Sequence, residues 1–253
     1  MTILTTEGIV LSAMRYGETS KIIRFATREY GVQSAIAKGA MRPRSRFGAA
    51  IQVLSRGQLQ LLPARSSDLH TLTAFDLLHL PVGLGARIER YTAAEAMAEL
   101  VLRFAPADAH PALYDAFKES LAQLETAAPE TAGVVALRGL WRLVTLLGFA
   151  PATEACVLDG EQLPVGGPLP FSVREGGALC AACARTHAVS VLPPEDRVAL
   201  AALCAPEAPL PSLDARREAA HRRLLTRFIH QQVAEGAELP ALEVWQRRAW
   251  EPA

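Results

Sequence analysis

The sequence predicts an α+β, multidomain protein in which an N-terminal β-barrel is followed by an α-helical domain with an inserted zinc-ribbon-like finger. Three observations predict this fold. Residues 1–80 contain short alternating apolar runs separated by glycines, as β-strands do. After Pro81 the apolar residues recur three and four positions apart, which is typical of helices. Residues 151–190 interrupt the helical pattern with Pro, Gly and three of the four cysteines. We therefore expect a barrel at 1–80 and a helical domain at 81–253, with the finger at 151–190.

The strands expected in the first domain follow one another with no helix between them. Their ranges are 8–11, 21–26, 32–37, 51–54, 57–62 and 69–80. Five or six short strands with glycine turns favour a small closed barrel over a sheet covered by helices. The segment 38–48 is basic, and Pro and Gly break it too often for regular structure.

The helices expected in the second domain have clear ends. The first, 84–104, stops before Pro106, the second covers 111–124, and the third covers 132–147 with Gly148 as its C-terminal stop. The third is apolar nearly all round, so we expect it at the centre of the bundle. After the finger, helical periodicity returns at 195–203 and in a long helix for which Ser212 is the expected N-cap.

The net charge of zero conceals an asymmetry between the two halves. Residues 1–80 hold ten Lys/Arg and five Asp/Glu, a balance of +5, and the remaining 16 and 21 leave −5 for residues 81–253. A basic barrel beside an acidic half indicates that the barrel faces a polyanion. Small barrels of this size commonly bind single-stranded nucleic acid, with cations on the phosphates and aromatic rings on the bases.

The cations expected to contact phosphate lie on the strands and on the basic segment. They are Arg15, Lys21, Arg24, Lys38, Arg42, Arg44, Arg46 and Arg56, with Arg28 as a further candidate. Tyr16, Tyr30 and Phe47 are the candidate stacking rings, whereas Phe25 is expected in the core. Any single Arg can instead be an ordinary solvated side chain, but three guanidiniums on alternating loop positions repel one another unless an anion is bound.

Four residues of the finger have the spacing of a metal site. Cys180 and Cys183 form a C-x-x-C knuckle, and Cys156 with Asp159 and Gly160 resembles a second knuckle whose second Cys is Asp. The segment 171–179 between them is expected to form a hairpin. Cys156, Asp159, Cys180 and Cys183 would thus hold one structural zinc ion per chain.

Other interpretations of the cysteines remain open. His187 or Cys204 can supply the fourth ligand in place of Asp159, and the cysteines can also be small buried side chains without a metal. The chain begins without a basic stretch followed by an apolar one, so we expect no secretory signal, reduced thiols and a cytoplasmic, nucleoid-associated protein.

The sequence contains none of the common catalytic or nucleotide-binding motifs. No convincing acid–base pair is evident, and we expect a protein that is not an enzyme. The arginine-rich stretch 216–227 is either a solvated helix face or a second surface for DNA or a protein partner. A zinc-ribbon hydrolase is the weakest of the alternatives.

Short motifs along the whole chain resemble one bacterial family. In the first half they are Tyr16-Gly17-Glu18-Thr19-Ser20, Thr27 with Tyr30-Gly31, and Ala37-Lys38-Gly39-Ala40 before the basic segment. In the second half they are Leu147-Gly148-Phe149-Ala150-Pro151, Cys156 with Gly160, Phe171-Ser172, Gly176-Gly177 and Cys180-Ala181-Ala182-Cys183. In this combination and order they resemble RecO, the recombination-mediator and DNA-repair family of the RecFOR pathway.

The resemblance implies an OB-fold barrel, a helical domain and, in many members, a zinc finger. It also implies binding of single- and double-stranded DNA, annealing of complementary strands, and action with RecR to load RecA on strands coated by single-stranded-DNA-binding protein. The chain departs from zinc-binding members at Asp159, where they usually carry Cys. The alternative function is that of a non-catalytic adaptor whose helical half recruits repair partners, and in either case a monomer in isolation is expected.

Overall fold

The computed structural model describes residues 2–48 and 50–248, and the chain divides into two compact units. Unit 1 is Met1–Glu125 and unit 2 is Thr126–Ala253. The strands of the expected barrel all lie in unit 1, which also contains three helices. The compact units thus meet after Glu125, whereas the sequence predicts a boundary between a DNA-binding barrel and a helical domain at residue 80. That functional boundary stays a prediction.

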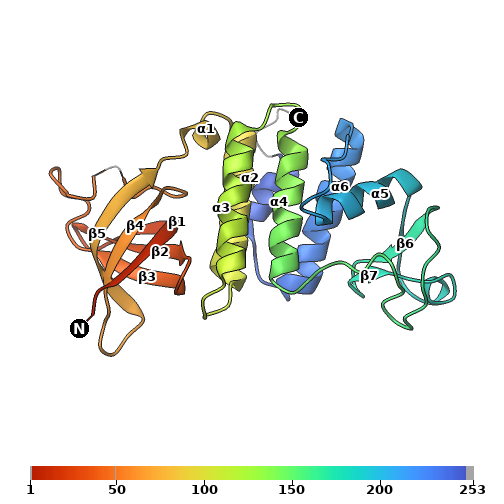
Figure 1. The fold of residues 1–253 in the computed structure, drawn as a ribbon, viewed down its shortest axis with the longest axis horizontal. Coiled ribbons are helices and arrows are strands. Elements are labelled where there is room, and N and C mark those ends of the chain that lie inside the picture. Colours follow the sequence, from red (N-terminus) through yellow and green to blue (C-terminus); the bar gives the residue numbers. More distant parts are fainter. Residues whose placement is uncertain (1, 49, 249–253) are drawn as a thin grey trace. The chain divides into compact units, whose positions relative to one another are not determined.

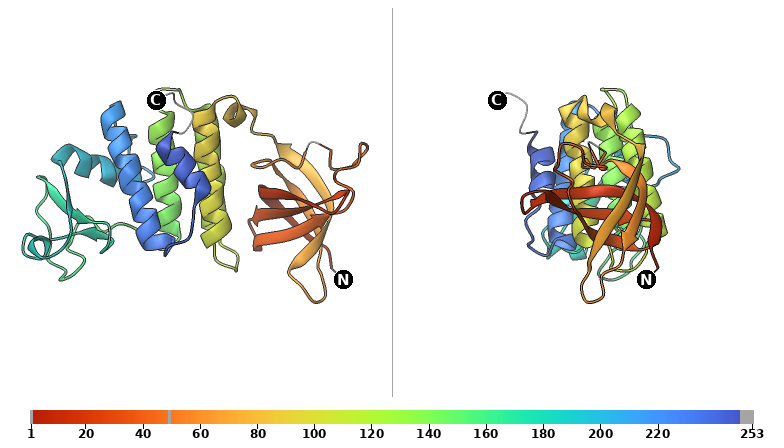
Figure 2. Two further views of the ribbon diagram at one scale, coloured as in Figure 1. Left: turned by 180° about the vertical axis from the view of Figure 1, so that it is seen from behind. Right: turned by 90° about the vertical axis from the view of Figure 1, so that its left-hand side faces the viewer.

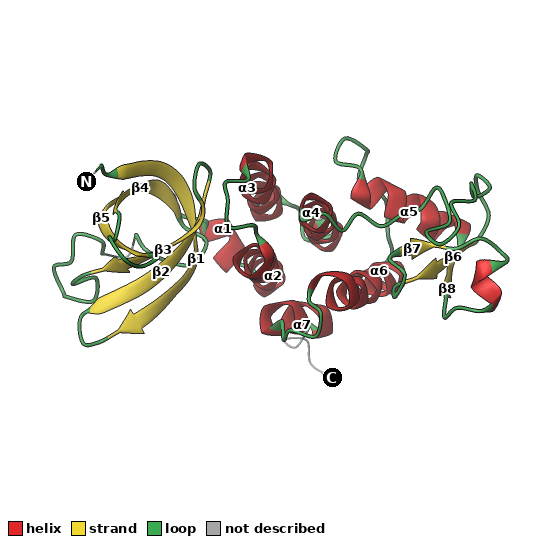
Figure 3. Ribbon diagram, turned by 90° about the horizontal axis from the view of Figure 1, so that it is seen from below, coloured by secondary structure: helices red, strands yellow, loops and turns green. Residues whose placement is uncertain are grey.

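Five strands form a closed barrel in unit 1 (Figures 1 and 3). The strands are β1 (Leu4–Tyr16), β2 (Ser20–Thr27), β3 (Gly31–Ala37), β4 (Arg56–Leu62) and β5 (Leu69–His79). Their order around the barrel is β1-β2-β3-β5-β4, and β4 returns to β1. Only the β3–β5 pair is parallel among the described strands. The predicted barrel is confirmed, and this strand order is that of the OB-fold.

Alternation of side chains fills the barrel interior. Along β2, Ile23 and Phe25 are fully buried while Arg24 between them is half-buried, so successive residues point in and out as strand geometry requires. Phe25 and Phe75 stack with ring centroids 6.1 Å apart at the centre of this core. The interior of the barrel is therefore packed with side chains, which leaves its outer surface and loops for ligands.

The segment between β3 and β4 differs from the prediction in two ways. Residues 51–54 were expected as a strand but form turns, in which Leu54 has a φ of +70° and is buried. Phe47, expected as a stacking ring, is only 2% exposed and belongs to the barrel core. Phe47 and Ile51 pack in the barrel core from this loop instead of pairing in the sheet.

Three helices complete unit 1: α1 (Val82–Gly85), α2 (Ile88–Phe104) and α3 (Pro111–Thr126). Polar contacts join α3 to the barrel, since Tyr114 Oη donates to Glu7 Oε1 at 2.9 Å and Arg28 forms an ion pair of 3.0 Å with Asp115. His79 at the end of β5 pairs with Glu125 at 2.7 Å. These contacts explain why the compact unit extends beyond the strands.

Helices α4 (Ala132–Leu146), α5 (Pro194–Cys204), α6 (Ala215–Phe228) and α7 (Pro240–Arg247) form the body of unit 2. α4 runs beside α6, and the Trp141 ring meets Phe228 edge-on at 5.1 Å (Figure 1). α7 packs against α6 (Figure 2). The helix α6 continues into a π-helical turn, η2 (Ile229–Val233). The N-cap of α6 is Asp214, which accepts a bond from Arg217 N at 2.8 Å, so the prediction of Ser212 as the cap was wrong.

The finger of unit 2 contains a three-stranded sheet in the order β7-β6-β8. Its strands are β6 (Leu169–Ser172), β7 (Gly177–Ala178) and β8 (Ser190–Leu192), and the short turn η1 is Cys183–Arg185. β6 and β7 form the predicted hairpin, with Gly176 at φ +82° in its turn. β8 pairs with the other edge of β6 and was not expected from the sequence.

Candidate metal centre and nucleic-acid interface

The two knuckles of the finger bring four possible metal ligands together. The ligand atoms of Cys156, Asp159, Cys180 and Cys183 all lie within 4.8 Å of one another. In the first knuckle Gly160 N donates to Cys156 O at 2.9 Å, and Gly160 has the φ of +77° that this tight turn requires. In the second, Ala184 N donates to Cys180 O at 2.9 Å. Each turn therefore aims both of its ligands at one point.

The Asp159 carboxylate accepts most of the hydrogen bonds in this cluster. The thiols of Cys180 and Cys183 each donate to its Oδ2 at 3.2 Å, and Glu161 N donates to its Oδ1 at 3.0 Å. The Glu161 amide, followed by the three thiols, holds the pKa of the Asp159 carboxyl well below its usual range. The same carboxylate raises the pKa of the Cys183 thiol to about 12. Without a metal, the carboxylate is charged and the Cys183 thiol is protonated.

Three sulfurs and one carboxylate oxygen match the coordination number and ligand types of a structural zinc site. Cys156 and Cys180 are buried, whereas Asp159 is exposed and Cys183 is half-buried, so an ion here would lie at the surface of the finger. Among the described residues, neither His187 nor Cys204 joins the cluster. The His187 ring is within hydrogen-bond distance of the Cys183 carbonyl at 2.9 Å, and Cys204 lies on α5, where burial raises its pKa to about 12. The cluster can hold a metal ion with Asp159 as the fourth ligand.

Seven of the nine cations expected at the nucleic-acid site fall into two groups on the barrel. Lys38, Arg42, Arg44 and Arg46 are exposed on the segment between β3 and β4. Successive turns order this segment: Arg42 N donates to Gly39 O at 3.1 Å and Ser45 N to Arg42 O at 2.9 Å. The Arg46 guanidinium lies 5.0 Å from the centre of the Phe47 ring, which anchors the loop in the core. We call residues 38–48 the basic loop.

The second group lies at one end of β1 and β2. Arg15 and Lys21 are directly opposite each other in the β1–β2 ladder, so their side chains share a face. Arg24 is opposite Ser12 on β1 and Ser34 on β3, on the outer face of the barrel. Tyr16, 53% exposed, extends from the same end of β1, and Tyr30 is half-buried in the β2–β3 turn. Met14, two residues before Tyr16 on β1, is 57% exposed, and an apolar residue in a strand gives no sequence signal of such exposure.

Two of the nine candidate cations are held by acidic residues. Arg56 Nη1 lies 3.2 Å from Glu7 Oε2, and Arg28 is paired with Asp115 of α3. Glu7 also accepts from Lys118 Nζ at 3.3 Å, so Arg56 belongs to a charge network that links the barrel to α3. Across the part of the chain that the structure describes, Arg42, Arg44 and Arg46 have no such acidic partner.

A closed OB-type barrel, joined to a helical unit that carries a four-ligand ribbon, defines the class of this protein. Family models give it a place within that class: the N-terminal model of recombination protein O matches residues 1–81, and its C-terminal model matches residues 85–239. The chain therefore belongs to the RecO family, which acts in DNA repair and recombination through the RecFOR pathway. The resemblance in the sequence motifs is thereby confirmed.

Relatives named DNA repair protein RecO match over most of their length. The Rubrobacter xylanophilus protein is 32% identical over 183 residues, which are 72% of this chain and 72% of the relative. The Exiguobacterium sibiricum protein is 36% identical over 178 residues, 69% of this chain and 68% of the relative. That of a Synechococcus strain is 32% identical over 220 residues, which are 83% of this chain and 72% of the relative.

None of the helices within residues 2–48 and 50–248 has the length and apolar character to cross a membrane.

Proposed function

We propose that this chain is a DNA-binding recombination mediator that holds single- and double-stranded DNA on the outer surface of its barrel. The observation that carries this proposal is the basic loop. Its three exposed guanidiniums stand on a loop anchored by Phe47, without a carboxylate among the described residues to neutralise them. Their mutual repulsion is relieved when phosphates bind, which releases counterions from the DNA.

The proposed site comprises Arg15, Lys21, Arg24, Lys38, Arg42, Arg44, Arg46 and Arg56. Arg56 contributes least, because a phosphate there must compete with Glu7 at 3.2 Å. Tyr16 supplies an exposed ring for stacking on a base, which is worth about 1–3 kcal/mol per base in single-strand-binding proteins. Since phosphates and ring stacking are common to all sequences, binding is independent of DNA sequence.

We infer that the ribbon binds one structural zinc ion through Cys156, Asp159, Cys180 and Cys183. Zinc in this site would stabilise the finger by joining its two knuckles, and with all four positions filled by protein it leaves no open position for catalysis. This supports a protein that acts by binding and not as an enzyme.

Family membership supports the remaining steps of the proposal. Annealing of complementary strands, cooperation with RecR, and loading of RecA on DNA coated by single-stranded-DNA-binding protein are expected of a RecO family member in the cytoplasm, at the nucleoid.

A specific observation favours the adaptor alternative as a second activity. Leu80 and Val82, exposed by 36% and 68%, line a pocket of about 400 Å³, a surface of the kind used for protein partners.

Binding and annealing can be tested with the full chain. Fluorescence anisotropy of labelled single- and double-stranded oligonucleotides should give affinities that fall steeply with salt. Annealing of complementary strands should accelerate over the same protein concentrations. Absence of binding at low salt, together with stable binding of RecR, would replace the mediator with the adaptor.

A further inference from the structure

The helix α6 sorts its five arginines into two sets. Arg217 is paired with Asp196 at 2.8 Å, and the buried Arg222 is paired with Glu218 and lies 5.3 Å from the centre of the Trp245 ring. These two arginines stabilise unit 2. Arg216, Arg223 and Arg227 are exposed, and no ion pair within the described residues involves them.

The three exposed arginines lie on one side of α6. Their spacing of seven and four residues returns to the same face, because a helix completes a turn every 3.6 residues. Exposed Ala220 lies between Arg216 and Arg223 on that face. At 1.5 Å per residue the row is roughly 16 Å long. We call Arg216, Arg223 and Arg227 the α6 row.

The acidic residues of this helix cannot neutralise the α6 row. Asp214 caps the helix through Arg217 N, and Glu218 is buried between Arg222 and Arg248, 2.7 Å from the latter. Arg223 and Arg227 are four residues apart, the spacing at which like charges repel each other on a helix. An uncompensated row of this kind is stabilised when an anion of matching length binds along it.

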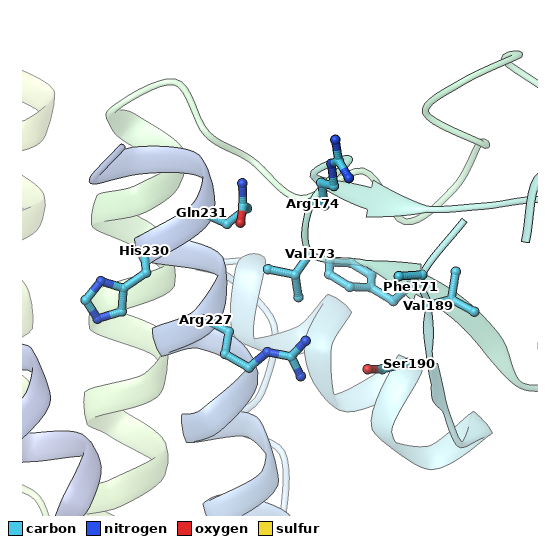
Figure 4. A pocket seen from close by; sticks show the side chains of 9 residues that line it. Phe171, Val173, Arg174, Val189, Ser190, Arg227, His230 and Gln231 are labelled. Carbon is cyan, nitrogen blue, oxygen red and sulfur yellow. The ribbon is translucent and has the colours of Figure 1, made fainter. Parts of the chain in front are cut away.

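A pocket of about 390 Å³ lies at the C-terminal end of the row. Arg227 extends from α6 towards Phe171 and Ser190 of the ribbon sheet, and Val189 adds to the apolar wall (Figure 4). Arg174, also at this pocket, points outward with its side chain 82% exposed, while the His230 ring projects away from the ribbon (Figure 4). The pocket is within the roughly 300–1,000 Å³ range of small-ligand sites. It offers a guanidinium beside apolar side chains, which suits one nucleotide of a strand.

We propose that the α6 row is a second DNA site, which takes the backbone of a separate single strand and receives one nucleotide in the adjoining pocket. This inference rests on the proposed function, and it adds to it that one chain holds two strands at once. Guanidiniums suit phosphate because their planar donors match two of its oxygens. An acidic peptide is the competing anion, but three guanidiniums spaced along one face of a helix favour a backbone with regularly spaced charges.

The test uses the full chain and two oligo-dT strands, which cannot pair with each other. One strand is immobilised and loaded with protein at low salt, and after washing a second, fluorescent strand is added. Wild type should capture the second strand. The variant R216Q/R223Q/R227Q should still bind the immobilised strand through the barrel, yet capture about tenfold less of the second strand, because three phosphate contacts are lost.

The control R87Q/R103Q/R247Q removes the same charge from three exposed but separate positions and should capture the second strand like wild type. Equal capture by wild type and the α6 variant, or no capture by wild type that has bound the first strand, would overturn the second site. Failure of wild type to bind the first strand would overturn the proposed function as well. If the row binds a polyglutamate peptide but no second DNA strand, its ligand is an acidic protein and the DNA proposal is wrong.

Circular dichroism and the thermal midpoint check that the α6 variant is folded. If the triple variant does not fold, the single exposed substitution R223E takes its place and should reduce capture of the second strand in the same direction. Normal capture by folded R223E contradicts the proposal.

Discussion

The Asp159 carboxylate lies 3.2 Å from the Cys180 thiol, where a paired-knuckle zinc site requires its fourth ligand. Oxygen is a weaker ligand than thiolate for structural zinc, but this carboxylate is charged in the absence of metal because the Glu161 amide and the neighbouring thiols lower its pKa. The substitution of Asp for Cys in the knuckle therefore leaves a complete ligand set. It also makes the site sensitive to pH and to changes at this one position.

Replacement of Asp159 should change zinc affinity in opposite directions. D159C provides four thiolates and should bind zinc more tightly than wild type. In D159A the zinc affinity should fall by more than the roughly 10–100-fold that follows the loss of a residue that only contacts a ligand. Competition with a chromophoric chelator measures both. Equal affinities for D159A and wild type would remove Asp159 from the site, and His187→Ala, which alters a residue outside the cluster, is the matched control.

Zinc affinity should fall as the pH falls. The Cys183 thiol has a pKa of about 12 beside Asp159, so it is protonated without metal and must release its proton when zinc binds. Protons then compete with zinc, and each step to lower pH should weaken binding. Chelator competition between pH 6.5 and 8 measures the slope, and a pH-independent affinity would mean that these thiols are not ligands.

The substitution E7Q should destabilise unit 1 by about 1 kcal/mol at neutral pH, since it weakens hydrogen bonds to a charged group. Burial alone would raise the pKa of Glu7, but the Tyr114 hydroxyl, Arg56 and Lys118 together lower it. A pKa below the unfolded value of 4.5 gives stability that is present above that pH and is lost as the pH falls through the folded pKa. In urea unfolding, the difference between E7Q and wild type should therefore shrink at acid pH. A difference that stays constant would contradict this assignment.

Acidification should also weaken unit 2 through His221, a buried side chain of α6. Burial lowers its pKa below the ordinary value of 6.5 although Asp196 lies 3.2 Å away and opposes the shift. The unfolded chain then takes up a proton more readily than the folded one, so stability is present above pH 6.5 and declines below it. Unfolding midpoints at pH 7.5 and 5.5 should fall more in wild type than in H221Q. An equal fall in both would exclude this histidine as the cause.

The sequence predicted the barrel because local patterns decide it: 32–37 and 57–62 alternate apolar and polar residues, and both became strands. Residues 51–54 are also mostly apolar, yet they form a loop that ends in a turn. Periodicity alone cannot distinguish such a turn from a strand. The metal cluster was predictable for a similar reason, because each knuckle is a local turn with fixed ligand spacing. Which residue joins the three cysteines depends on folding, and in the structure it is Asp159.

Charge pairing depends on contacts between distant parts of the chain, which no local pattern reveals. Arg56 and Arg42 look alike in the sequence, yet Glu7 holds Arg56 while Arg42 is exposed. The five arginines of α6 likewise look like one basic stretch until Asp196 and Glu218 are seen to engage two of them. Phe47 was misassigned because an aromatic ring between exposed arginines has no sequence signal of its burial.

The most direct test of the central claim is the salt dependence of oligonucleotide binding by R42Q/R44Q/R46Q. Loss of three phosphate contacts should lower the slope of log affinity against log salt by about 2 for single strands, and should weaken binding at every low-salt condition. The control R87Q/R103Q/R247Q should retain the wild-type slope at the same net charge. An unchanged slope and affinity in the basic-loop variant would contradict the account of DNA binding by this barrel.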